Sequence, residues 1–286
     1  YSFFWLSKET SILINNWFMM YFLSVVLIGT VYPIFLDVIS SQKISVGPPF
    51  YHKLIIPFLI PFLLMMAIGP KLKWIKSQLE DKIYLISFLI ISILLAFLVL
   101  KNFNQNILIN TILISSALYL FFITLRDFFV KKYKNISQNI AHFGFSLLIL
   151  SILFNNIFAS EIITNLKVGE TFENSKTKIV FESVDQKKEQ NYNAIIANFT
   201  ISNSNGEEDR LSPELRIYNQ PVIATSEADI KTTLMSDKFI VINLVQNQDF
   251  FNVRYQVKPF MLWIWLSVIL ISLGGIVSFF QKRHEK

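Results

Sequence analysis

Residues 138–158, QNIAHFGFSLLILSILFNNIF, decide the class of fold. As an α-helix, which rises 1.5 Å per residue, this stretch is about long enough to cross the ~30 Å hydrocarbon layer of a membrane. It carries no charged side chain, but His142 lies about one helical turn inside its start. The sequence therefore predicts a membrane span that contains an ionisable group.

His142 has two interpretations. An ionisable side chain inside a span costs free energy and therefore points to a function. Neutral imidazole is the commonest metal ligand in proteins, and it binds iron. Ala141 and Gly144 add little bulk beside the ring, so a flat cofactor could approach the helix closely. Alternatively, His142 is hydrogen-bonded at a helix end near the lipid headgroups. This segment alone leaves both interpretations open.

The composition extends the membrane interpretation to most of the chain. Of all residues, 53% are hydrophobic and 16% are charged, and the apolar residues come in long blocks. Such blocks are typical of membrane spans. Trp263 and Trp265 lie near the start of the last block, where an aromatic belt is expected. The six predicted spans are residues 11–36, 54–69, 83–100, 107–125, 138–158 and 260–280.

Two properties of the whole sequence exclude several kinds of site. The chain has no cysteine, which excludes disulfides, thiolate metal sites, thioether attachment of haem and cysteine nucleophiles within it. Its net charge of +6 comes from basic residues at the ends of apolar blocks, so we expect no nucleic-acid partner.

The first residue is Tyr1 and not Met, so we expect N-terminal material to be missing.

The basic residues also predict an orientation. Segments 71–82, 126–134 and 282–286 are rich in lysine and arginine, whereas segments 37–53 and 101–106 have few. Six crossings place the three basic segments on one side, which should be the cytoplasm. His142 would then lie near the cytoplasmic end of its span.

The first two spans are joined by a proline-containing linker. Gly47 permits a sharp change of direction, and Pro48 and Pro49 fix φ and remove two hydrogen-bond donors. The sequence therefore predicts a stiff, non-helical connector. Pro57 and Pro61 each remove a backbone hydrogen bond from the second span, for which neighbouring groups must compensate.

Residues 161–258 differ from the apolar blocks in composition and in the pattern of their side chains. They are polar, with alternating apolar and polar side chains and a hairpin-turn signal at residues 203–206. The predicted strands are residues 178–184, 195–202, 214–218, 239–245 and 253–257. The expected fold is thus a polytopic α-helical membrane protein with one inserted extracytoplasmic all-β domain, a barrel or a sandwich. The expected divisions are residues 1–159, 160–258 and 259–286.

Several short motifs, taken together and in order, resemble the C-terminal half of the CcmF family of cytochrome c maturation proteins. These motifs are Ser7-Lys8-Glu9 with Asn15-Asn16, the run 44–50 (ISVGPPF), Pro57 and Pro61 with Gly69-Pro70, Ala141-His142-Phe143-Gly144, the run 225–230 (TSEADI), and the run 253–260 (VRYQVKPF) followed by Trp263-Ile264-Trp265.

The resemblance implies a role in haem attachment. Members of this family take haem from the periplasmic chaperone CcmE and attach it to Cys-x-x-Cys-His motifs of apocytochrome c, and a CcmH-type protein that handles the apocytochrome is a further expected partner. They also hold a haem b between two histidines of different helices, and this haem reduces the chaperone-bound haem with electrons from quinol. By position, His142 matches one axial ligand of the haem iron. The other ligand and the tryptophan-rich haem-handling motif would lie upstream of Tyr1.

The resemblance also limits what this chain is expected to do. The thioether bonds form between haem vinyl groups and thiols of the substrate, so no catalytic side chain is predicted here. Gly47, Pro48 and Pro49 are expected beside the site where haem is handled, opposite the cytoplasm. His52 and His284 match no ligand position of the family. The expected location is a bacterial inner membrane, with the β domain in the periplasm and a mitochondrial inner membrane as the alternative.

Two other functions stay open. One is a paralogue of the same family that serves nitrite reductase and uses other apocytochromes. The other, of a different class, is a transporter or scaffold whose β domain binds a ligand. A transporter predicts paired acidic and basic residues at mid-membrane depth, or inverted repeats, and the sequence shows neither.

Overall fold

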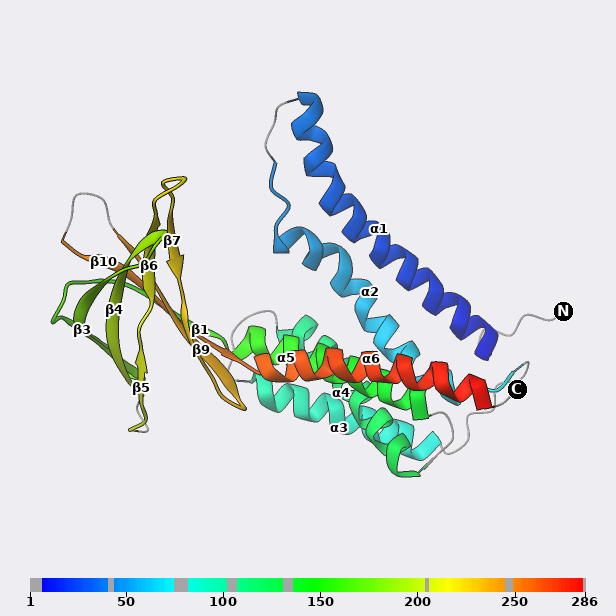
Figure 1. The fold of residues 1–286 in the computed structure, drawn as a ribbon. Coiled ribbons are helices and arrows are strands. Elements are labelled where there is room, and N and C mark those ends of the chain that lie inside the picture. The colour runs from blue at the N-terminus through cyan, green and yellow to red at the C-terminus, as the bar shows by residue number, and fades with distance from the viewer. Residues whose placement is uncertain are drawn as a thin grey trace. The chain divides into compact units, whose positions relative to one another are not determined.

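The computed structural model describes residues 7–40, 44–74, 82–101, 107–130, 136–203, 206–244 and 249–284. The chain divides into two compact units, Tyr1–Leu150 with Leu266–Lys286, and Ser151–Trp265. The first unit is helical, and the second holds all the strands of the described residues (Figure 1). The predicted fold class, a helical membrane protein with an inserted all-β region, is confirmed.

Six helices of the described residues are long and apolar enough to span a membrane. Each of them contains one of the predicted spans nearly in full. Their bounds are α1 Lys8–Ser40, α2 Pro48–Ile68, α3 Lys82–Leu100, α4 Ile107–Val130, α5 Ile136–Phe158 and α6 Met261–His284, with a short 3-10 helix η1, Gly69–Lys71, directly after α2.

The start of α2 corrects one prediction. Pro48 and Pro49 form the first turn of this helix, and Gly47 is its N-cap. The expectation of a non-helical connector is therefore wrong at the two prolines. A proline in the first turn removes an N–H that has no partner within the helix anyway, and its fixed φ already suits a helix. The Gly47 carbonyl accepts a hydrogen bond from the Phe50 N–H at 3.1 Å, which closes this first turn.

Close helix packing in the first unit relies on glycine. A Cβ atom at Gly29 of α1 would meet the Tyr51 ring of α2, and one at Gly69 would meet the Ser11 side chain. The start of α1 therefore lies against the end of α2, and the two helices run antiparallel. A Cβ atom at Gly274 of α6 would lie 2.8 Å from the backbone nitrogen of Ala141, which brings α6 against α5.

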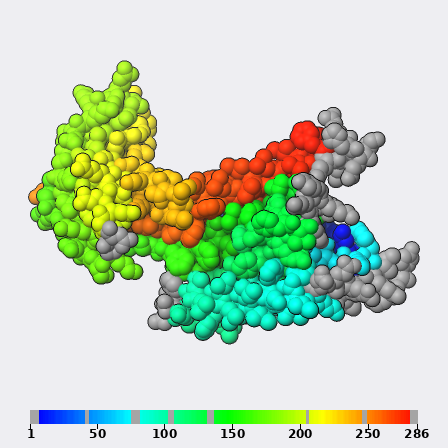
Figure 2. Space-filling model, turned by 90° about the horizontal axis from the view of Figure 1, so that it is seen from below, coloured from blue at the N-terminus to red at the C-terminus, as the bar shows by residue number. Residues whose placement is uncertain are grey.

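α4 is the most deeply buried of the helices. It packs against α2 and α3, and its Phe121 and Phe128 rings contact Phe143 of α5. α3 in contrast exposes many of its isoleucine and leucine side chains, and it forms part of the outer surface in Figure 2. An exposed apolar surface of this kind fits contact with lipid.

The second unit contains two antiparallel sheets. One has the strand order β1-β10-β9-β8, and the other has the order β2-β3-β4-β6-β7, with β5 paired to β4. The strand bounds are β1 Ser160–Leu166, β2 Thr171–Glu173, β3 Thr177–Lys188, β4 Tyr192–Asn203, β5 Glu208–Leu211, β6 Glu214–Tyr218, β7 Ala224–Glu227, β8 Asp229–Thr232, β9 Ser236–Leu244 and β10 Phe251–Pro259.

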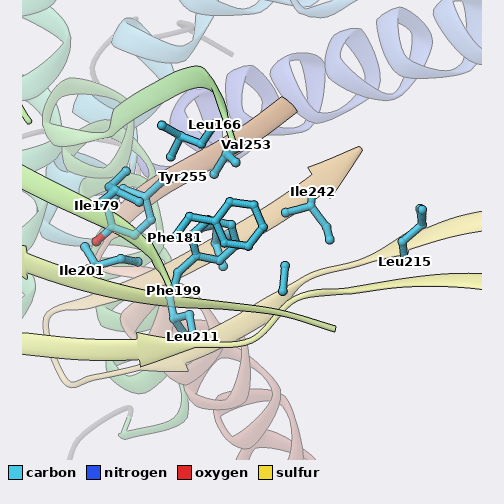
Figure 3. Close-up of a cluster of buried hydrophobic side chains, with 12 residues drawn as sticks. Leu166, Ile179, Phe181, Phe199, Ile201, Leu211, Leu215, Ile242, Val253 and Tyr255 are labelled. Carbon is cyan, nitrogen blue, oxygen red and sulfur yellow. The ribbon is translucent and has the colours of Figure 1, made fainter. Parts of the chain in front are cut away.

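A hydrophobic core lies between these sheets (Figure 3). Phe181 of β3 stacks on Phe199 of β4 at 4.5 Å between ring centroids and meets the edge of Phe251 of β10 at 5.5 Å. Such ring pairs add to the stabilisation that burial of their apolar area provides. Four of the five predicted strands lie within β3, β4, β6 and β10, and the fifth, residues 239–245, lies in β9 except for residue 245, which is outside the described residues. The predicted turn at residues 203–206 falls partly on residues 204 and 205, which lie outside the described residues.

Candidate functional site

His142 lies in the second turn of α5 and lines a cavity of about 440 Å³ in the helical unit. This volume is within the ~300–1,000 Å³ that is usual for small-molecule sites. The wall is built by four helices and by η1. Its residues are Lys8, Ser11, Ile12, Asn15 and Met19 of α1, Phe62, Met65 and Met66 of α2, Gly69 and Pro70 of η1, Gln138, Ala141, His142 and Phe145 of α5, and Ile271 of α6.

The wall is apolar apart from a few side chains. Phe62 packs edge-on against Phe145 at 5.8 Å and joins α2 to α5 beside the histidine. Three methionines add flexible thioether side chains, which adapt to irregular shapes. The polar members are the Lys8 ammonium, the Ser11 hydroxyl, two amides and the imidazole. An apolar molecule with anionic groups suits the chemistry of this lining, and haem, a planar apolar ring with two carboxylates, is such a molecule.

The small residues beside His142 have a different role from the predicted one. A Cβ atom at Gly144 would come within 3.0 Å of Ile271 and Leu270 of α6. The space beside Gly144 is therefore filled by α6 and is not open to a flat cofactor. The α6 helix fixes α5 from this side, while the His142 ring borders the cavity together with α1 and α2.

A buried ion pair lies close to the histidine. The Lys71 ammonium of η1 donates to Oδ2 of Asp127 in the last turn of α4. The two side chains are only 6% and 10% exposed, and both charges act electrostatically on the His142 ring. The other carboxylate oxygen of Asp127 is buried without a hydrogen-bond partner among the described residues.

Sequence reasoning missed this ion pair. Lys71 was counted with a basic loop, and Asp127 stands directly after Arg126 at the end of a span. The available signal was a single acidic residue at the end of an apolar span, which requires a partner when it is buried. The pair lies at helix ends and not at the middle of the spans, so it does not match the pattern that a transporter predicts.

The other singled-out residues lie elsewhere. Gly47, Pro48 and Pro49 begin α2, whereas the cavity is lined by the last turns of that helix and by η1. Their role in haem handling stays a prediction. His52 is exposed in the first turns of α2, and the side chain of His284 lies outside the described residues. Within the described ranges, no three His, Asp or Glu side chains form a metal-binding group.

Comparison with known proteins finds similarity to CcmF. The family model described as the CcmF C-terminal beta-sandwich matches residues 157–259. The cytochrome c-type biogenesis protein CcmF of Haemophilus influenzae is 27% identical over 98% of this chain. The chain is similar to the C-terminal part of CcmF.

The CcmF match extends beyond the β-sandwich. CcmF of Pseudomonas fluorescens is 26% identical, again over 98% of the chain. The solved structure of the cytochrome c haem lyase CcmF covers 96% of the chain with a TM-score of 0.72 at 21% identity, which shows that the fold is shared. The chain spans about half the length of the curated CcmF relatives it matches, 46% and 44% of the two proteins.

Three of the CcmF-like sequence motifs converge on one cavity. Lys8 and Asn15 come from the first motif, Gly69 and Pro70 from the proline-containing one, and His142 from the Ala-His-Phe-Gly motif. These segments are far apart in the sequence, and only the antiparallel packing of α1 on α2 and the position of α5 bring them together. The cavity is therefore the candidate functional site of the helical unit.

Proposed function

We propose that this chain acts in cytochrome c biogenesis as part of a CcmF-type haem lyase, and that its helical unit holds a haem b with His142 as one axial ligand. The observation that carries the proposal is the position of His142 in the wall of an apolar cavity built by several helices. The second axial ligand would come from a part of the protein upstream of Tyr1.

The physical chemistry of the cavity supports the proposal. Coordination by iron offsets the cost of placing a neutral imidazole in an apolar span. The identity of the axial ligand and the polarity of its surroundings are the means by which a protein sets the potential of haem. Phe62, Phe145 and Ile271 make these surroundings apolar.

The polar part of the cavity suits the haem carboxylates. Lys8 supplies a cation, and the Asn15 and Gln138 amides supply hydrogen-bond donors. The Lys8 ammonium also lies 5.2 Å from the centre of the Trp74 ring, which limits where this cation can sit. The Lys71–Asp127 pair would add a fixed dipole near the iron ligand, and Ala141 against Gly274 would hold the helix that carries it.

When bound, the haem would supply one-electron transfer, reducing the haem that CcmE delivers with electrons drawn from quinol. The chain itself would position and insulate this group. Apocytochrome c, brought by a CcmH-type protein, would supply the thiols for attachment, so no side chain here is assigned a catalytic role. The location would be a bacterial inner membrane, with the β-sandwich in the periplasm. A nitrite-reductase-specific paralogue would use the same cavity, and it would differ in its apocytochrome.

The test is the optical spectrum of the tagged chain, purified in detergent with the proteins that bind it. We expect the spectrum after reduction to show a b-type haem, and the His142→Ala variant to lose that signal. His52→Ala is the matched control, because His52 is an exposed histidine of the same unit and should leave the spectrum unchanged. A haem signal that His142→Ala leaves intact would refute the ligand assignment.

A further inference from the structure

The turn between β8 and β9 exposes two large apolar side chains. Leu234 is 70% and Met235 is 63% exposed. Exposed apolar residues at loop tips are common and by themselves indicate nothing. Val222, which is 81% exposed in the connection between β6 and β7, is an example in the same unit. What distinguishes the β8–β9 turn is its rigid attachment to the start of α6.

The turn is rigid because its own polar groups close it. The Thr233 N–H donates to the Ser236 carbonyl at 2.9 Å, and the Thr233 hydroxyl donates to the same carbonyl at 2.7 Å. The Ser236 N–H in turn donates to the Thr233 hydroxyl oxygen at 3.0 Å. The backbone that carries Leu234 and Met235 is therefore fixed, and both side chains point away from it without a covering element in the described structure of this unit.

Two hydrogen bonds place the turn beside the first residues of α6. The Trp263 indole N–H donates to the Leu234 carbonyl at 3.0 Å, and the Phe260 N–H donates to the Met235 carbonyl at 2.8 Å. Ser236 also pairs with Pro259 at the end of β10. The turn is thus held at the level where the chain passes from the last strand into α6.

The start of a membrane-spanning helix lies near the boundary between lipid headgroups and acyl chains. α6 is one of the helices able to span a bilayer, and tryptophans near the ends of such helices favour the headgroup region. A turn bonded to Trp263 must lie at nearly the same depth as this tryptophan. Leu234 and Met235 would otherwise expose their apolar area to water, whereas the boundary between headgroups and acyl chains would cover it.

We propose that the β8–β9 turn inserts Leu234 and Met235 into the interfacial layer of the bilayer, on the side where α6 begins. The occupant of this surface is lipid. The turn thereby acts as a contact between the β-sandwich and the membrane surface, in addition to the two helices that connect to the sandwich. The inference is independent of the proposed haem site, because it uses none of the cavity residues.

The absence of cysteine from the printed sequence allows a direct test. A single cysteine is introduced as Leu234→Cys, labelled with the environment-sensitive dye NBD, and the chain is reconstituted in vesicles of phosphatidylcholine and phosphatidylglycerol. We expect a blue-shifted emission and several-fold stronger quenching by lipids with a nitroxide near the headgroup than by lipids with one near the chain end. Met235→Cys repeats the measurement, should the first variant fold poorly.

Val222→Cys is the matched control. β7 lies beside the far end of β9, because Ser226 donates to Asn243 at 2.6 Å, so Val222 is remote from the β8–β9 turn. We expect water-like emission and little quenching there. Water-like emission at Leu234 as well would overturn the proposal. So would a blue-shifted Leu234 probe that nitroxide lipids do not quench, since protein and not lipid would then cover the turn.

Discussion

The ammonium of Lys71 and the carboxylate of Asp127 join the end of η1 to the last turn of α4 through a buried ion pair. Removal of one partner from such a pair leaves an uncompensated charge in an apolar environment, at a cost of about 3–5 kcal/mol. We therefore expect Asp127→Leu and Lys71→Met each to destabilise the helical unit by this amount. Denaturant-induced unfolding of the detergent-solubilised chain, followed by circular dichroism, measures the effect.

The double variant is the control for this prediction. With both charges replaced by apolar residues of similar size, most of the lost stability should return, because no unpaired charge remains. Losses that simply add in the double variant would show that the two side chains act independently.

Gly274 of α6 provides a second prediction. A Cβ atom there would lie 2.8 Å from the Ala141 nitrogen, against backbone that cannot move aside cheaply. Gly274→Val should therefore separate α6 from α5 and shift His142, with a destabilisation of about 1–3 kcal/mol. Gly275→Val is the matched control, since a Cβ atom at Gly275 has no neighbour within 4 Å.

The measurement for the glycine pair is thermal unfolding in detergent, together with the position of any haem absorption band. Gly274→Val should lower the midpoint and perturb the band, and Gly275→Val should do neither. Equal effects of the two valines would mean that helix propensity, and not packing against α5, controls this region.

The β-sandwich contains a buried acid that predicts a dependence on pH. Burial raises the pKa of the Asp209 carboxyl, but hydrogen bonds from Lys231 at 2.5 Å and Lys238 at 2.6 Å outweigh it and hold the pKa below its usual value. A carboxyl whose pKa is lower in the folded state stabilises that state at pH values above its unfolded pKa of about 3.9, and this stabilisation is lost as the pH falls through the folded value.

We therefore expect the sandwich of the wild-type chain to lose stability as the pH falls below about 4. Asp209→Asn should be less stable at neutral pH and should show a weaker loss on acidification. Hydrogen exchange of β5 and β9 peptides at several pH values, in the detergent-solubilised chain, checks this. A variant whose protection falls with acid as steeply as that of the wild type would contradict the assignment to Asp209.

Long runs of apolar residues made the six helices predictable, because a span must satisfy its backbone hydrogen bonds internally and carries few charged side chains. Strict alternation made β4 and β10 predictable in the same way. β5 (EDRL) and β8 (DIKT) could not be found, since they are four residues long, and three residues of β5 and two of β8 are charged. Asp209 of β5 instead forms ion pairs across the two sheets with Lys231 of β8 and Lys238 of β9.

The sequence singles out one residue of the candidate site and not the residues around it. His142 is unusual within its own span, so the sequence alone draws attention to it. The packing of Lys8 and Asn15 around the same cavity depends on how α1 pairs with α2, which no local pattern specifies. Pro48 and Pro49 were misjudged because a proline pair fits both a stiff loop and a first helical turn, and only the residues that follow decide between them.

The pairing of β1 with β10 also explains how a sandwich can be inserted in the sequence between two helices of one bundle. Ser160 lies opposite Val257, and the Asn155 side chain donates to the Pro259 carbonyl at 2.6 Å, so the strand that leaves α5 and the strand that reaches α6 are immediate neighbours. The chain thus enters and leaves the sandwich at neighbouring positions. A short loop could bridge that gap, which makes the sandwich a removable module whose loss or exchange need not alter the packing of α5 against α6.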